Sequence, residues 1–139
     1  MLYASKGRSF TKFYMSSNLK HKIDNKTAKI SVIGAGYVGL PLAIAFASSG
    51  FKVCAIDNDE VKVKQINAGE SYIPDISAQT IRELSIKEAL VATTDYSIIE
   101  SSDCVIICVP TPVSKTRDPD VSFIIDAANS ISNYVHKDM

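Results

Sequence analysis

The sequence has no tryptophan, only two histidines, and no excess of charge of either sign. His21 and His136 lie far along the chain from Cys54, Cys104 and Cys108, and these cysteines form no CxxC pair. We therefore expect no metal site and no disulfide framework. Fifteen basic side chains balance fifteen acidic ones, so nucleic acid is not an expected partner.

Long hydrophobic runs are also absent. The longest, residues 38–47, contains glycine and proline, and it is well below the roughly 20 residues needed to cross a bilayer. No membrane span is therefore expected, and the cysteines fit reduced thiols in a cytoplasmic protein. With 139 residues, 46% of them hydrophobic, the chain is long enough for one domain with a core.

The first 28 residues differ from the rest. They carry six Lys or Arg side chains against one acidic residue, Asp24, and show no sustained hydrophobic period. We interpret residues 1–28 as a flexible basic leader. Organelle targeting is a less favoured alternative, because the stretch has one arginine and no clear apolar face.

From residue 29 onward, short apolar runs alternate with helical periods. Strands are predicted at 30–33, 53–56, 90–93 and 104–109, and helices at 38–49, from Asn58 to near Gly69, at 78–88, at 95–101, and after Pro119. This alternation predicts an α/β fold, a Rossmann-like doubly wound parallel sheet.

Two of these helices have a predicted buried face. Positions 38, 42, 45, 46 and 49 should form it in the first helix, and positions 121, 124, 125, 128, 131 and 135 in the last. A helix like the last one normally leads to another parallel strand. We therefore interpret residues 29–139 as an incomplete domain, truncated after its fourth strand and the helix that follows.

A glycine-rich turn follows the first predicted strand and opens a helix. It consists of Gly34, Ala35, Gly36, Tyr37, Val38 and Gly39 and has the GxGxxG spacing. In dinucleotide-binding folds the first glycine permits the turn, the second lets the backbone approach a pyrophosphate, and the third lets the helix pack closely. The alternative is that the glycines only serve close packing.

Asp57 ends the second predicted strand, at the usual distance from the first glycine for a carboxylate that binds the adenosine ribose. Such a carboxylate would repel a 2′-phosphate, so NAD is favoured over NADP. Lys62, one helical turn further on, could contact a phosphate or the ribose. The alternatives are that Asp57 only caps the next helix and that Lys62 is a solvated surface residue.

The fourth predicted strand ends in Val109, Pro110, Thr111 and Pro112. In the strand order 3-2-1-4 this turn faces the glycine turn across the ligand crevice. We expect Val109, Pro110 and Thr111 to contact the cofactor; a proline-fixed turn without a ligand is the alternative. The three cysteines have apolar neighbours inside predicted strands, which favours structural thiols over nucleophiles.

Four separated stretches, "KISVIGAGYVGLPLAIAFA", "AIDNDEVKVKQINAGESYIPDI", "ATTDYS" and "DCVIICVPTPVSKTRDPD", together resemble the NAD-binding domain of the UDP-glucose/GDP-mannose dehydrogenase family. The resemblance is greatest to its UDP-N-acetylglucosamine 6-dehydrogenase branch. It implies that two NAD oxidise the C6 alcohol of a nucleotide sugar to a carboxylate, for surface polysaccharide synthesis. It also implies NAD contacts at Val38, Asp57, Lys62 and Thr111.

The same resemblance implies what the chain lacks. The family's catalytic glutamate, lysine and cysteine, together with its central and C-terminal domains, correspond to positions beyond Met139. We therefore expect no catalytic residue here and no turnover by the chain alone, and we expect the full-length enzyme to be a homo-oligomer. A stand-alone NAD-sensing module without catalysis is the alternative.

Overall fold

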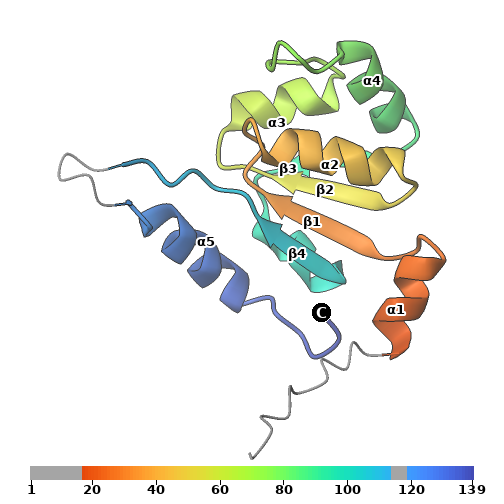
Figure 1. Cartoon of the computed structure of the whole chain (residues 1–139), viewed down its shortest axis with the longest axis vertical. Coiled ribbons are helices and arrows are strands. Elements are labelled where there is room, and N and C mark those ends of the chain that lie inside the picture. Colours follow the sequence, from red (N-terminus) through yellow and green to blue (C-terminus); the bar gives the residue numbers. More distant parts are fainter. Residues whose placement is uncertain (1–16, 114–118) are drawn as a thin grey trace, which may run out of the picture.

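A computed structural model of the protein describes residues 17–113 and 119–139. Its centre is a four-stranded parallel sheet in the order β3-β2-β1-β4, formed by β1 (Lys29–Ile33), β2 (Lys52–Ile56), β3 (Leu90–Thr93) and β4 (Cys104–Ile107) (Figure 1). The predicted Rossmann-like α/β fold is confirmed. The last paired residues, Ile33, Ile56 and Ile107, lie side by side, so the segments after β1, β2 and β4 leave the sheet at one edge.

Helices cover both faces of the sheet (Figure 1). One face packs against α2 (Gly39–Ser48), α3 (Glu60–Asn67) and α4 (Ala78–Ile86), and the larger hydrophobic core lies between them. The other face packs against the 3₁₀ helix η1 (Tyr96–Ser101) and α5 (Ser122–Ser132), around Ile33, Ile56 and Ile99. Asp59 and Asp95 cap α3 and η1 by accepting backbone N–H bonds.

The buried face of α2 differs from our prediction. Leu40, Ala43 and Ala47 are buried, whereas Val38 is 69% exposed and Ala45 is also exposed. The sequence of α2 is apolar almost all round, so hydrophobic periodicity defines its orientation poorly. Small alanines face the sheet, which lets the helix lie close to it.

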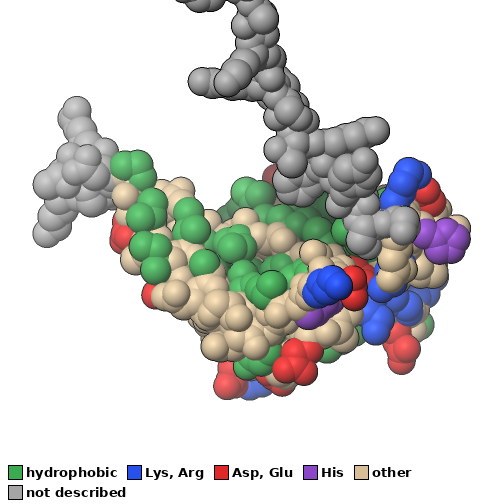
Figure 2. All heavy atoms as spheres, turned by 90° about the horizontal axis from the view of Figure 1, so that it is seen from below, with side chains coloured by type: hydrophobic (Ala, Val, Ile, Leu, Met, Phe, Trp, Pro, Cys, Tyr) green, Lys and Arg blue, Asp and Glu red, His purple; other side chains and the backbone are tan. Residues whose placement is uncertain are grey.

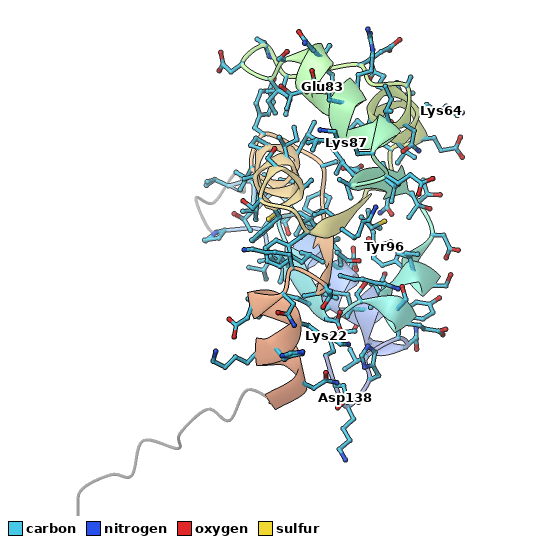
Figure 3. All side chains as sticks on the ribbon, turned by 90° about the vertical axis from the view of Figure 1, so that its right-hand side faces the viewer. Lys22, Lys64, Glu83, Lys87, Tyr96 and Asp138 are labelled. Carbon is cyan, nitrogen blue, oxygen red and sulfur yellow. The ribbon has the colours of Figure 1, made fainter. Side chains whose placement is uncertain are left out.

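The expected basic leader contains a short helix, α1 (Ser17–Asp24); residues 1–16 lie outside the described range. Lys22, which projects from α1 (Figure 3), pairs with Asp103 at 2.5 Å, and the other oxygen of that carboxylate accepts the backbone N–H of Lys29 at 2.9 Å. The pKa of Asp103 is lowered, because these bonds outweigh the opposing effect of burial. The pair connects α1 to the start of β4.

The predicted buried face of the last helix, α5, is mostly exposed. Of its six positions only Ile131 is buried; Val121, Ile124 and Ile125 are 38% to 54% exposed, positions 128 and 135 are also exposed, and the buried Ala127 lies outside the predicted face. Hydrophobic side chains gather in a row where α5 lies, at the left of Figure 2. The helix lies beside β4, whose outer edge pairs with no strand of the described residues. Among residues 17–113 and 119–139, no helix has the length and apolar character needed to span a bilayer.

Candidate functional site

A cleft of about 490 Å³ lies at the sheet edge where β1, β2 and β4 end. It brings together residues from three distant parts of the chain. Eight of the predicted site residues line it: Gly34, Gly36, Tyr37, Val38, Asp57, Lys62, Val109 and Pro110. The other three do not line it: Ala35 and Gly39 are buried, and Thr111 is exposed.

Two glycines of the turn are fixed by packing. A Cβ on Gly34, whose φ is +91°, would lie 2.6 Å from the carbonyl oxygen of Cys108, and a Cβ on Gly39 would lie 1.7 Å from the carbonyl oxygen of Gly34. The Gly34 N–H also donates to Ile56 O at 2.7 Å. The turn is therefore held between β2, β4 and the start of α2, as the sequence predicted for its first and third glycines.

The middle glycine is in a different situation. A Cβ on Gly36 would meet no atom within 4 Å. Among the described residues, the backbone N–H groups of positions 36–39 donate no hydrogen bond, and no side chain caps the start of α2. Unpaired N–H groups at the positive end of a helix dipole, with room in front of them, form a site for a phosphate anion.

Asp57 faces the same cleft with its carboxylate already oriented. Oδ2 accepts the Ala35 N–H at 2.7 Å and lies 3.6 Å from Lys62 Nζ, and Oδ1 accepts the Asp59 N–H at 2.9 Å. The cap of α3 is Asp59 and not Asp57. Because each carboxylate oxygen has two lone pairs, Asp57 can still accept hydroxyl groups of a ligand.

Sequence reasoning missed two residues of the cleft wall, Ile107 and Cys108. We placed both inside a buried strand over residues 104–109, but β4 ends at Ile107, which leaves Cys108 half-buried at the edge. Burial raises the pKa of the Cys108 thiol and of the Cys54 thiol, the latter to about 11. Both are therefore protonated at neutral pH, which agrees with their assignment as structural cysteines.

The described residues contain no group of three or more His, Cys, Asp or Glu side chains arranged to hold a metal ion. The chemistry of the cleft is instead that of a nucleotide site. It offers backbone donors for a diphosphate and a carboxylate for ribose hydroxyls, between apolar walls formed by Val38, Val109 and Pro110. The residues present fit a dinucleotide.

Comparison with known proteins agrees with this geometry. The sequence model of the NAD-binding domain of the UDP-glucose/GDP-mannose dehydrogenase family matches residues 28–139. The UDP-N-acetyl-D-mannosamine dehydrogenase of Methanococcus vannielii is 36% identical over 120 residues, which are 84% of this chain and 27% of that protein.

Two solved structures are also similar. The UDP-D-ManNAc dehydrogenase of Pyrococcus horikoshii has 37% identity and a TM-score of 0.72, over 77% of this chain and 26% of that one. The GDP-mannose dehydrogenase of Pseudomonas aeruginosa, solved as a ternary complex, has 32% identity and a TM-score of 0.71, over 73% of this chain and 24% of that one. The chain spans between 12% and 27% of the curated relatives compared with it.

Proposed function

Because the chain belongs to the UDP-glucose/GDP-mannose dehydrogenase family and is an NAD-binding domain of that family, we propose that it holds NAD for the oxidation of a UDP-N-acetylhexosamine at C6 to the uronic acid. Bound NAD supplies the hydride acceptor, and two are reduced for each alcohol taken to a carboxylate. The names of the relatives support N-acetylmannosamine over the N-acetylglucosamine that the sequence suggested. We also propose that the full-length enzyme is a homo-oligomer in the cytoplasm and that its product is used for surface polysaccharide synthesis.

One observation carries the proposal: unpaired backbone donors and an oriented carboxylate face one cleft. The N–H groups at positions 36–39 would bind the pyrophosphate, and Asp57 would accept the hydroxyls of the adenosine ribose. Lys62 lies close enough to Asp57 to contact the same ribose or a phosphate. Val109 and Pro110 would form the opposite wall, and Thr111, which follows them in the chain, does not line the cleft.

We assign the NAD-binding unit to residues 29–139, and we assign catalysis to parts of the enzyme that correspond to none of these positions. The test is to titrate the 139-residue chain with NAD by calorimetry and then to supply NAD with UDP-N-acetylmannosamine or UDP-N-acetylglucosamine. We expect NAD binding and no NADH formation with either sugar. Absence of NAD binding by the folded chain would contradict the cofactor role, and steady NADH formation would contradict the assignment of catalysis elsewhere.

A stand-alone NAD-sensing module was the alternative suggested by the sequence. It is not favoured, because the named relatives are dehydrogenases and the same domain serves them as part of a longer chain. Formation of NADH from NAD and a UDP-N-acetylhexosamine by a protein that contains this domain together with further residues would exclude the sensing module.

The ribose contact can be tested with Asp57→Ala. We expect this variant to bind NAD about 10- to 30-fold more weakly, because hydrogen bonds to a charged acceptor are lost, whereas its weak binding of NADP should change by less than about threefold. Calorimetric titration of both cofactors against both proteins measures the two ratios. Equal losses for NAD and NADP would contradict a contact with the ribose 2′-hydroxyl.

Asp57→Asn is the matched control for this variant. The amide oxygen can still accept the Ala35 N–H, so the glycine turn keeps its support while the negative charge is removed. We therefore expect Asp57→Asn to bind NADP more tightly than the wild-type chain, because the repulsion of the 2′-phosphate is gone. Unchanged NADP binding in this variant would show that charge at position 57 does not set the preference.

A further inference from the structure

Tyr72 lies outside the cleft but bonds directly to the glycine turn. Its hydroxyl donates to the carbonyl oxygen of Ala35 at 2.5 Å, although α2, β2 and α3 separate the two residues along the chain. We propose that Tyr72 is a positioning residue for cofactor binding, which fixes the peptide between Ala35 and Gly36 from behind the cleft. The inference rests on the proposed NAD-binding function and adds a residue to it.

The geometry of the peptide bond gives Tyr72 this effect. In a trans peptide the C=O and the following N–H lie in one plane and point in opposite directions, and the described residues contain no cis peptide bond. A hydroxyl that holds the Ala35 carbonyl therefore also sets the direction of the Gly36 N–H. Gly36 lines the cleft, and its N–H has no acceptor among the described residues.

The peptide between Gly34 and Ala35 is held by a hydrogen bond as well. Its N–H donates to Asp57 Oδ2 at 2.7 Å, and Ala35 is fully buried. Tyr72, Ala35 and Asp57 thus form a continuous chain of hydrogen bonds that joins the proposed ribose acceptor to the proposed phosphate donors. Loss of the Tyr72 bond would free one side of the turn while Asp57 still holds the other.

The loop between α3 and α4 is built to present Tyr72. Gly69, with φ +73°, ends α3 tightly against Arg82, and Ile73 is buried in the core beside the tyrosine. The Ser71 hydroxyl donates to Ile73 O at 2.9 Å, which closes the loop around Tyr72. Burial raises the pKa of Tyr72, and the negative charges of Asp57 and Asp59 raise it further. The hydroxyl therefore keeps its proton and remains a donor at every physiological pH.

The test is Tyr72→Phe, with Tyr96→Phe as its matched control. Tyr96, which is labelled in Figure 3, is also partly buried. Its pKa is raised by the same causes, first by burial and then by the charge of Asp57. Among the described residues, however, its hydroxyl makes no hydrogen bond. We expect Tyr72→Phe to weaken NAD and ADP-ribose binding about tenfold, the effect of one hydrogen bond, and Tyr96→Phe to change neither by more than about twofold.

A second measurement separates positioning from general stability. In the cofactor-free protein, Tyr72→Phe should shift the amide ¹⁵N resonance of Gly36. It should also accelerate amide hydrogen exchange at Ala35, and this acceleration should be about tenfold larger than the acceleration at Val32 or Ala55 in the sheet. Uniform acceleration at all these amides would overturn the positioning role, since it would indicate loss of stability only. NAD binding by Tyr72→Phe equal to that of the wild-type chain would overturn it too. Failure of the wild-type chain itself to bind NAD would instead overturn the proposed function.

Discussion

Gly39→Ala is expected to leave the chain unfolded, or to lower its free energy of unfolding by about 3 kcal/mol or more. The new methyl group would lie 1.7 Å from the carbonyl oxygen of Gly34 and 3.2 Å from Cys108 Cβ. The first of these atoms belongs to the backbone, which is held by the bond between the Gly34 N–H and Ile56. Relief of the clash would therefore require α2 to move away from the sheet and from the core that it covers.

Thermal unfolding followed by circular dichroism measures this effect. Gly50→Ala is the control, because its Cβ would meet only Lys26 side-chain atoms at 3.9 Å although its φ is +96°. Its cost should be limited to the left-handed backbone conformation, about 1–2 kcal/mol. If Gly39→Ala unfolded at the same temperature as the wild-type chain, the close packing of α2 on the glycine turn would be wrong.

The order of the strands and the meeting of Gly34, Asp57 and Val109 at one edge could be predicted from the sequence. Parallel strands joined by helices have few possible arrangements, and all of them bring the carboxyl ends of the strands to the same side. The positions of the glycine turn, the acidic residue and the proline turn therefore followed once the strands were identified. Each of these three features follows directly after a predicted strand, so its place in the fold depends only on the order of the elements along the chain.

The orientation of the helices could not be predicted in the same way. In α2 nearly every residue is apolar, so the choice of Leu40, Ala43 and Ala47 for the buried face depends on the fit of small side chains to the sheet. In α5 the hydrophobic period is regular, yet Ile124 and Ile125 remain exposed because the helix contacts the sheet along only part of its surface. Packing decides both cases.

The bond between Tyr72 and Ala35 could not be predicted from the sequence either. Tyr72 lies in the stretch "AIDNDEVKVKQINAGESYIPDI", which carries the family resemblance but indicates no chemical role for this side chain. A tyrosine in a loop has no periodic neighbour that would indicate its partner. Its contact with Ala35 arises from the tertiary packing of the loop between α3 and α4 against the glycine turn.

The middle glycine of the turn should respond in the opposite way to Gly39. We expect Gly36→Val to fold with a melting temperature close to that of the wild-type chain but to bind NAD at least about 100-fold more weakly. Open space surrounds the site of the new Cβ, so the fold tolerates it, whereas the branched side chain would occupy the volume in front of the N–H groups at positions 36–39. Loss of two hydrogen bonds to a charged phosphate costs about 3 kcal/mol or more.

Calorimetric titration with NAD, alongside a thermal melt of each protein, separates these two consequences. Gly36→Ala provides the graded control, since its single methyl group should fold equally well and weaken NAD by less than the valine does. A Gly36→Val chain that folds and still binds NAD within about threefold of the wild-type affinity would contradict the placement of the pyrophosphate at this turn. Equal loss of stability in Gly36→Val and Gly39→Ala would contradict the distinction between an open glycine that faces the cofactor and a closed one that packs the helix.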